Sequence, residues 1–532
     1  MKARNQYLIC LAVMLCVQII LMTYFGFQKQ NLHVDEYFSY YSTSDNDFYV
    51  NLQDREWNPG NIAIKKCIVD LDDRFDYKNV YEMEAKDVHP PLYYYCLHTV
   101  CSIIPEVFSK WTGLGLNIFF FALSFIILGN ITWLLSEGNH KMVLAVNLFY
   151  GFNPAVISLV MFIRMYMLLT VLIMLFVYIH LLIVKAEYRL SIKRILAIAA
   201  VSFAGFLTHY YFLIFAGIFA AVFAVAAWIR TRRVKVNLLN LGSFLLGTGL
   251  AVLYYPACIE HIFFGYRGTG AQASFLDISN TLYRLQYFTH LTSRFAFAGC
   301  MKEILAAILV ITASAGIVLF LKRKEGMWRK CSFIWSGAWI AMILAAAGYY
   351  ILVAKTALTN EDEMVRYVIP VYAFFFLILI AFLSLAGKIL LSSERTRKKA
   401  GAVLLLGGML LNVYGMSRGN ILFLYPESKE RIAFAKENSN AAVVQIYGNE
   451  GWTWEIAEEL ESYPEIYCVS GSNLSRIEDE RIENSDKIVV YIDHTDAQIE
   501  QRGIELILES NDKVTRYEKH FETVYYDIYL FQ

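Results

Sequence analysis

The chain is dominated by apolar segments that are long enough to cross a membrane. Hydrophobic residues make up 57% of its 532 residues, charged residues only 18%, and the mean hydropathy is +0.43. This composition is typical of membrane proteins and is too apolar for a soluble protein of this length. We expect eleven spanning helices, at residues 7–26, 113–135, 142–161, 167–184, 192–208, 210–229, 237–257, 302–321, 332–353, 367–387 and 401–418.

The Lys and Arg residues between these segments predict the direction in which each helix runs. Cytoplasmic loops of membrane proteins carry an excess of Lys and Arg. This excess falls on alternate loops if the helix at 91–104 lies in the membrane interface and does not cross. We therefore predict a plasma-membrane protein with an uncleaved first helix, a cytoplasmic N-terminus and an extracytoplasmic C-terminus. The basic positions are Lys2, Arg4, Lys141, Lys185, Arg189, Lys193, Arg194, Arg230, Arg232, Arg233, Lys235, Lys322, Arg323, Lys324, Arg329, Lys330, Lys388, Arg395, Arg397, Lys398 and Lys399.

Charge is divided unequally along the chain, which predicts a domain boundary near Pro426. Residues 427–532 hold 23 acidic and 10 basic side chains, whereas residues 1–426 hold 24 acidic and 37 basic ones. We predict an all-α polytopic membrane domain over 1–426, with a large first extracytoplasmic loop at 28–112. The acidic tail at 427–532 is predicted to be a separate extracytoplasmic domain.

Apolar periodicity predicts that the tail is a small α/β domain. Strand-like runs occur at 441–447 and 487–492, and the β-rich segment 514–531 follows. Amphipathic helical patterns occur around 454–460 and 497–508. The tail has no Gly-rich phosphate loop and no evident acid/base grouping, so we expect an accessory or substrate-positioning role.

An acidic pair follows the first span, in the sequence HVDEYFSYYS. Asp35 and Glu36 lie where the apolar helix meets the polar first loop. A carboxylate held against partly dehydrated aromatic surroundings can act as a general base toward a hydroxyl group. The alternative interpretation is an acidic pair that caps the next helix.

A second polar motif, DVHPPLYYYCLH, stands at the other end of this loop. Two prolines fix an extended entry into the following helix, because the residue before a proline avoids the α region. Such a rigid turn could present Asp87 and His89 to the cleft that contains Asp35. The alternative is a stiff helix start, which explains the prolines but not the flanking Asp and His.

Three further loop ends place polar side chains beside tyrosines on the predicted extracytoplasmic side. Arg164 and Tyr166 occur in FIRMYML, His209 and Tyr210 in LTHYYFL, and Arg366 and Tyr367 in EDEMVRYVIP. A guanidinium group at the membrane boundary suits a phosphate or pyrophosphate group, although it can also reach toward lipid head groups. The histidine has a structural alternative as a simple hydrogen-bonding residue.

The sequence does not identify a metal or an organic cofactor. Its nine cysteines are scattered, without a CxxC pair or a grouping with histidine, so neither a zinc site nor a disulfide framework is indicated. No basic run interleaved with aromatics suggests nucleic acid as a partner. The metal requirement stays open, with a divalent cation as a candidate.

The order of these motifs resembles that of the bacterial GT-C glycosyltransferases. The chain is similar over most of residues 1–420 to the group of protein O-mannosyltransferase-like (family 39) and aminoarabinose transferases. The resemblance implies a membrane enzyme that transfers a sugar from a polyprenyl-phosphate carrier to an extracytoplasmic acceptor in the cell envelope. The acceptor, a lipid, a glycan or a protein, stays unidentified because the acidic tail matches no known acceptor-binding module.

The resemblance also implies roles for individual residues. Asp35 and Glu36 match the acidic motif of the first loop, where the Asp is the expected base or acceptor-orienting group. The segment around Asp87 and His89 is similar to the HPP turn of the group. The residues expected to shape the donor pocket are Arg164, Tyr166, His209, Tyr210, Arg366 and Tyr367.

Two other classes of function compete with the transferase. A lipid or polysaccharide transporter would be expected to keep polar or broken helices near the middle of the membrane. Charged side chains are nearly absent from the middles of the predicted spans, which disfavours a transporter. A non-catalytic relative that only binds a glycan is the third alternative. For the transferase, a single base and no second nucleophile would predict inversion at the sugar.

Overall fold

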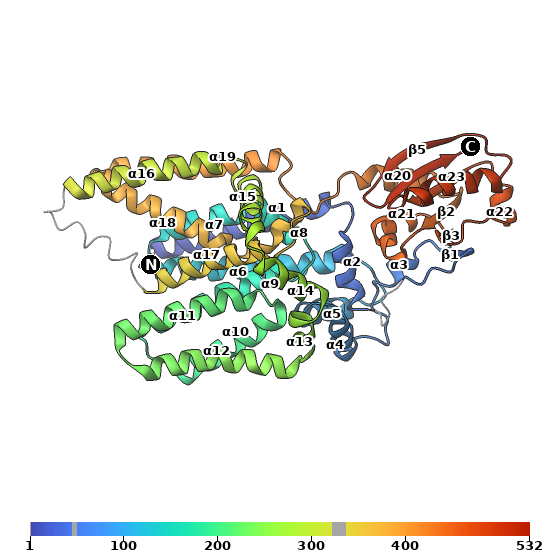
Figure 1. Ribbon diagram of the computed structural model, residues 1–532. Coiled ribbons are helices and arrows are strands. Elements are labelled where there is room, and N and C mark those ends of the chain that lie inside the picture. Colours follow the sequence, from blue (N-terminus) through green and yellow to red (C-terminus); the bar gives the residue numbers. More distant parts are fainter. Residues whose placement is uncertain (1, 45–49, 322–336) are drawn as a thin grey trace. The chain divides into compact units, whose positions relative to one another are not determined.

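The structure, a computed structural model, describes residues 2–44, 50–321 and 337–532. The chain divides into two compact units. The helical unit comprises Met1–Gly26, Glu84–Tyr93 and Leu114–Phe423, and the mixed unit comprises Phe27–Met83, Tyr94–Gly113 and Leu424–Gln532. In Figure 1, the helical unit contains long helices that run side by side, and the mixed unit contains the sheet.

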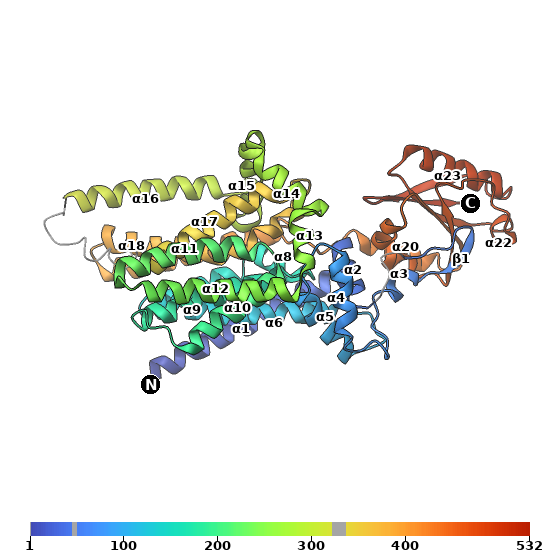
Figure 2. The same ribbon diagram turned by 60° about the horizontal axis from the view of Figure 1, so that its bottom comes forward.

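Nine helices in the described part of the chain are long and apolar enough to cross a membrane, by length and composition. The protein is therefore a multi-pass membrane protein. Helices α10 and α12 pack against each other, as do α11 and α17, and Figure 2 shows α10, α11 and α12 as neighbours. The nine are α1 (Lys2–Gln28), α6 (Lys110–Leu135), α9 (Tyr166–Lys185), α11 (Phe212–Thr231), α12 (Val234–Tyr254), α16 (Met301–Leu321), α17 (Gly337–Thr356), α18 (Tyr372–Leu390, with the 3₁₀ turns Asp362–Tyr367 and Ile369–Val371 before it) and α19 (Glu394–Ser417).

Two helical regions account for the difference from the eleven spans expected. The segment 142–161 is a pair of helices, α7 (His140–Gly151) and α8 (Pro154–Met161), bent by 56°, and it makes a tenth span only if the pair is counted as one. Asn153 caps α8 and Pro154 begins it, which explains the break. Helix α10 (Ile192–Thr208) has the expected bounds, but its 17 residues span about 26 Å, less than a membrane core of about 30 Å.

The remaining helical elements connect these helices. The expected interfacial helix at 91–104 is α5 (Leu92–Ile103), and it follows α4 (Tyr77–Lys86). Between α12 and α16 the chain forms α13 (Ala257–Phe263), α14 (Tyr266–Leu276), a 3₁₀ turn (Ile278–Asn280) and α15 (Thr281–Phe297). The start of the expected span at 332–353 and the basic positions from Lys322 to Lys330 lie outside the described residues.

The mixed unit contains a six-stranded sheet with the strand order β1-β3-β2-β4-β6-β5. Strands β3, β2 and β4 are parallel, and β1, β6 and β5 are antiparallel to their neighbours. The strand and helix regions expected in the tail are confirmed, whereas β3 was not expected. The strands are β1 (Glu56–Pro59), β2 (Ala442–Tyr447), β3 (Glu465–Ser470), β4 (Ile488–Asp493), β5 (Tyr517–Glu522) and β6 (Tyr526–Phe531).

Short helices complete the mixed unit. They are α2 (Val34–Tyr41), α3 (Ile62–Lys65), α20 (Ser428–Glu437), the 3₁₀ helix η6 (Glu450–Ile456), α21 (Ala457–Leu460), α22 (Glu480–Glu483) and α23 (Ala497–Ser510). Strand β1 belongs to the first loop and pairs with β3, more than 400 residues further along the chain. The core of the unit consists of branched aliphatic side chains from β2, β4 and α23 and aromatic side chains from β6. The first loop and the acidic tail thus fold together around one sheet.

Candidate functional site

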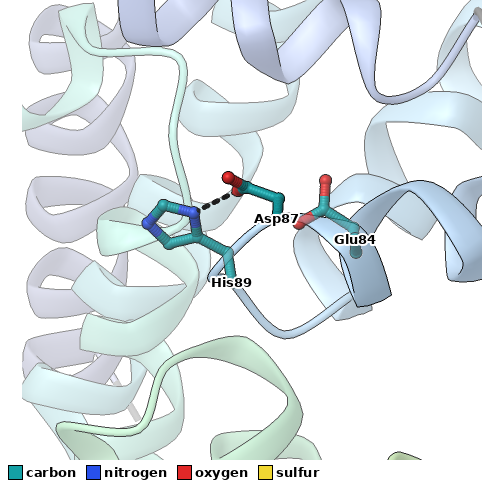
Figure 3. Close-up of side chains that lie close together, drawn as sticks. All are labelled: Glu84, Asp87 and His89. Carbon is teal, nitrogen blue, oxygen red and sulfur yellow. Dashed lines mark hydrogen bonds and ion pairs between the residues drawn. The ribbon is translucent and has the colours of Figure 1, made fainter. Parts of the chain in front are cut away.

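In the helical unit, the turn between α4 and α5 brings three potential ligands close together. The side chains of Glu84, Asp87 and His89 each offer one ligand atom, and these atoms lie within 4.8 Å of one another (Figure 3). His89 Nδ1 lies 2.7 Å from Asp87 Oδ2. Glu84 is fully buried, whereas the Asp87 and His89 side chains remain 30% and 22% exposed.

These three residues could hold a divalent cation. Two carboxylates and an imidazole suit several divalent metals. The ring nitrogens of His89 already lie near Asp87 and near Arg164, so a cation bound by this histidine would replace one of those contacts. Three ligand atoms of these types therefore fit a divalent cation. Its binding would compete with the contacts of His89 to Asp87 and Arg164.

Arg164 lies beside this turn, on the connection between α8 and α9. Its Nη2 atom is 3.3 Å from Nε2 of His89 and 3.4 Å from Nδ1. Only 4% of Arg164 is exposed. Tyr255 donates a hydrogen bond to the His89 carbonyl oxygen at 3.1 Å, which fixes the backbone of the turn. The structure thus brings Asp87 and His89 of the DVHPP motif together with Arg164 of the FIRMYML motif.

Burial and neighbouring charge shift the pKa values in this cluster. Burial by itself would raise the pKa of Asp87, but the charges of His89 and Arg164 and the hydrogen bond from His89 outweigh it and lower the pKa to about 2. Burial, together with the positive charges of His89 and Arg164, lowers the pKa of His209 to about 3. His209 is therefore neutral at physiological pH, and its Nδ1 accepts a hydrogen bond from the Tyr211 amide at 3.1 Å. Asp87 is ionised.

Aromatic contacts link the other predicted residues to the same end of the helical unit. The ring of Tyr166 lies 5.6 Å from that of His209 and 5.7 Å from that of Tyr367. Tyr367 also contacts Tyr211, with the ring centres 6.0 Å apart. The turn after α10, the start of α9 and the segment before α18 therefore meet through Tyr166 and Tyr367.

Tyr210 and Arg366 complete the predicted set. The hydroxyl of Tyr210 lies 2.9 Å from Nδ1 of His261, whose Nε2 is 3.2 Å from the Ala85 carbonyl oxygen. Tyr210 therefore supports the turn through His261. The guanidinium of Arg366 lies over the ring of Phe162 at 5.1 Å and is only 4% exposed. A buried guanidinium stacked on an aromatic ring keeps its charge and its planar donors in a low-dielectric setting.

The acidic pair of the first loop belongs to the mixed unit, and its two members differ. Glu36 is fully buried and pairs with Lys29 at 2.8 Å. It also accepts from the His33 amide at 2.7 Å, while His33 Nδ1 accepts from the Asp35 amide, so both ends of a capping box are made. Glu36 thus has a structural role at the start of α2. The Asp35 side chain is 26% exposed and lies 3.7 Å from His33.

Several residues of these sites were not identified from the sequence. Glu84, Tyr255 and His261 support or extend the turn in the helical unit, and Lys29 neutralises Glu36. A signal for Glu84 existed, because it lies on the buried face of α4 with Val80 and Met83, at helical spacing. A carboxylate on an apolar helix face indicates a buried hydrogen-bonding, ionic or metal partner, because an unpaired buried charge is costly. Hydropathy alone does not identify that partner.

Comparison with known proteins gives a match of fold only. Neither a scan against protein-family models nor a search of curated proteins found a match. The crystal structure of ArnT from Cupriavidus metallidurans bound to undecaprenyl phosphate matches with a TM-score of 0.50 at 11% sequence identity, over 99% of this chain and 98% of that one.

The archaeal oligosaccharyltransferase AglB from Archaeoglobus fulgidus, in complex with an inhibitory peptide and a dolichol-phosphate, is similar over 92% of this chain and 69% of that one. Its TM-score is 0.44 at 9% identity, which is too low to support a conclusion. ArnT, by contrast, matches along the full length of both chains. The chain therefore has the GT-C fold, which it shares with ArnT.

Proposed function

We propose that the protein is a membrane glycosyltransferase that moves a sugar from a polyprenyl-phosphate carrier to an acceptor outside the cytoplasm. The observation that carries the proposal is the cluster of Asp87, His89 and Arg164. Arg366 belongs to the adjoining motif, whose Tyr367 contacts Tyr166. Two buried guanidinium groups suit a phosphate group, since their planar donors match its oxygens. The fold shared with ArnT, which was crystallised with undecaprenyl phosphate, supports a lipid-linked donor.

In the proposed reaction, the acceptor hydroxyl oxygen attacks the anomeric carbon of the sugar. The bond between that carbon and the phosphate oxygen breaks, and its electron pair stays on the polyprenyl phosphate. The proton of the acceptor hydroxyl passes to a carboxylate that acts as general base, the role that the family resemblance implies for Asp35. Arg164 and Arg366 stabilise the charge that develops on the leaving phosphate. One displacement of this kind inverts the anomeric configuration.

A divalent cation fits this scheme as an additional component. Glu84, Asp87 and His89 would hold it, and it would supply positive charge to the donor phosphate. Without a bound cation, His89 lies between Asp87 and Arg164, with one ring nitrogen near each of them.

The orientation of the chain is part of the proposal. The distribution of Lys and Arg supports a cytoplasmic N-terminus and an extracytoplasmic mixed unit. The division of the chain into a transferase domain over 1–426 and an accessory domain over 427–532 is proposed on the same grounds. The sheet that joins the first loop to the acidic tail supports placing both on one side of the membrane.

Replacement of Asp35 by Asn tests the proposal. Membranes that contain the protein are supplied with labelled polyprenyl-phosphate sugars, carrying aminoarabinose, mannose or glucose, and transfer to envelope acceptors is measured. We expect Asp35→Asn to reduce transfer by about 100-fold or more, because the base is lost. Asp72→Asn is the matched control, since Asp72 is an exposed carboxylate of the same loop.

Two results would count against the proposal, and they differ in meaning. Undiminished transfer by Asp35→Asn would remove Asp35 from the mechanism while keeping the enzyme. Absence of transfer by the unmodified protein with all three donors would remove the enzyme itself.

A further inference from the structure

A cavity of about 460 Å³ opens in the mixed unit at the carboxyl ends of β2 and β3. We name it the strand-end pocket. Its lining residues come from the ends of β2 and β3 and from the first turns of α23, a helix that is drawn in red in Figure 1. Its lining consists of Gly448, Ser470, Gly471, Ser472, Leu474, Asp496, Gln498, Ile499 and Arg502.

The topology of the sheet explains why a cavity forms here. Gln445 of β2 donates a hydrogen bond to Thr453 of η6. The next residue of β2, Ile446, faces α23, since a Cβ added at Gly503 of that helix would lie 3.0 Å from its side chain. Consecutive strand residues point to opposite faces, so η6 and α23 cover opposite faces of the sheet. Helical elements on opposite faces leave space beyond the carboxyl ends of the parallel strands, and open α/β sheets bind ligands at these ends.

Two glycines keep this space open. A Cβ at Gly471 would lie 2.5 Å from the Ile499 side chain, and one at Gly448 would lie 3.0 Å from Ile499 and from Asp493. Larger residues would push Ile499 into the cavity. The backbone after both strands thus approaches α23 closely without filling the space between them.

The first loop holds one wall of the pocket in place. Asp54 accepts from the Ser470 amide at 2.7 Å and from the Asn473 side chain at 3.0 Å. Arg55 donates to the carbonyl oxygens of Asn473 at 3.3 Å and of Ser475 at 3.1 Å. The wall formed by residues 470–476 is therefore anchored by residues more than 400 positions earlier in the chain.

The charges around the pocket disfavour an anionic ligand. The N-terminus of α23 is already occupied by its own carboxylate, because Asp496 accepts from the Gln498 amide at 2.9 Å. Arg502 is held by both carboxylate oxygens of Glu509, each at 2.8 Å, and by Glu505 at 3.2 Å. Its positive charge is thus neutralised before any ligand enters.

The remaining groups suit a neutral ligand with many hydroxyl groups. The hydroxyls of Ser470 and Ser472 lie 2.8 Å apart, and the side-chain amide of Gln498 can both donate and accept. Ile499 and Leu474 add an apolar patch, which matches the C–H face of a sugar ring. Hydroxyl, amide and carboxylate groups beside a small apolar surface are the complement of a saccharide.

We propose that the strand-end pocket binds a neutral saccharide unit. Binding there needs neither the polyprenyl donor nor the residues of the helical unit. The inference is therefore independent of the proposed transfer reaction, and it gives the acidic tail a function of its own in holding a glycan.

The test measures sugar binding by the full-length protein in lipid nanodiscs, with no donor present. Saturation-transfer difference NMR is recorded with glucose, mannose and N-acetylglucosamine, and with glucose 6-phosphate as the anionic comparison. We expect at least one neutral sugar to bind in the range of about 1 to 10 mM, and glucose 6-phosphate to bind several-fold more weakly than glucose.

Two variants of the pocket and one control locate the binding. Ser472→Tyr should abolish it by filling the cavity, and Gln498→Ala should weaken it about fivefold through the loss of one hydrogen bond. Gln501→Ala is the matched control, because Gln501 lies one turn further along α23, is exposed and does not line the pocket. It should bind as the unmodified protein does.

The thermal unfolding of each variant is measured in parallel, so that a loss of binding is not confused with a loss of folding. Three results would overturn the proposal: no binding of any neutral sugar, stronger binding of glucose 6-phosphate than of glucose, or binding unchanged in both Ser472→Tyr and Gln498→Ala. None of these results bears on transfer, which is measured separately with Asp35→Asn.

Discussion

The two units bury charge in different ways. In the mixed unit, two buried carboxylates form closed pairs: Glu36 with Lys29 at 2.8 Å, and Glu459 with Arg431 at 2.7 Å. In both pairs the carboxylate side chain is fully buried. In the helical unit, Arg164 is buried beside His89 and Asp87, whose side chains keep a quarter or so of their surface exposed.

This difference separates a structural role from a binding role. A closed pair satisfies its charges within the protein, and removing one partner leaves the other uncompensated. A cluster in which two of three members are partly exposed, as Asp87 and His89 are, can exchange an internal contact for a ligand without breaking the fold. We therefore expect substitutions in the closed pairs to change stability, and substitutions in the cluster of Asp87, His89 and Arg164 to change activity.

The largest effect is expected for the closed pair at the start of α2. Glu36→Gln should lower the free energy of unfolding by about 3 to 5 kcal/mol, because Lys29 would stay buried with its charge uncompensated and the capping box would weaken. Thermal unfolding in detergent measures this. Asp35→Asn, at the adjacent and more exposed carboxylate, is the control and should cost less than about 1 kcal/mol. Equal losses in the two variants would remove the distinction between Asp35 and Glu36.

Substitutions in the cluster of Asp87, His89 and Arg164 should reduce sugar transfer. Arg164→Lys keeps the charge but loses the planar fork of donors, so we expect sugar transfer to fall about 100-fold, equivalent to about 2.7 kcal/mol in the barrier, with little change in thermal unfolding. Arg189→Lys, at an exposed position, is the control and should retain full transfer. A loss of stability in Arg164→Lys as large as that in Glu36→Gln would place Arg164 with the closed pairs.

A third substitution tests Glu458, a carboxylate of the mixed unit whose pKa is raised by burial and by two acidic neighbours. Burial, followed by the charges of Glu461 and Glu459, raises the pKa of Glu458 to about 7. A carboxyl whose pKa is raised on folding stabilises the protein below its unfolded pKa, near 4.5, and this stability is lost as the pH rises to about 7. We therefore expect the melting temperature to fall across this window.

Glu458→Gln should remove most of that pH dependence and raise stability at pH 8 by about 2 kcal/mol, since the glutamine stays neutral. Glu478→Gln, at an exposed carboxylate that does not contribute to the raised pKa of Glu458, should keep the dependence. A Glu458→Gln variant that melts with the same pH profile as the unmodified protein would show that Glu458 does not titrate in this range.

The smallest effect is expected for an exposed pair. Lys78 and Glu82 lie one turn apart on α4 at 3.4 Å, and both side chains are more than half exposed. Lys78→Ala should change the free energy of unfolding by less than about 0.5 kcal/mol, because solvent screens the interaction. A larger change would mean that exposure is a poor guide to which ion pairs stabilise this protein.

Much of the fold could be predicted because its signals are local. Apolar runs of about twenty residues indicated the long helices, and the bounds of α10 agree with the predicted segment. Short continuous apolar runs likewise indicated β2 and β4. The span count was less certain, since the bend between α7 and α8 depends on a cap and a proline within one apolar run.

The candidate sites were predictable only as separate motifs. The sequence named Asp87, His89 and Arg164, but it could not show that Arg164 lies against His89, because the two are 75 residues apart. It grouped Asp35 with Glu36, although burial gives them different surroundings. The strand-end pocket gave no motif, and the only signal for Glu84 was its helical spacing from Val80 and Met83.

The sequence by itself determined that the protein crosses the membrane many times and ends in an acidic α/β region, because hydropathy and periodicity are properties of neighbouring residues. Only the tertiary structure decided which distant residues meet. It joined β1 of the first loop to β3 of the tail, and it brought the turn at 84–91 to Arg164. Such contacts depend on how long loops close and how helices pack, and many arrangements share the same local pattern.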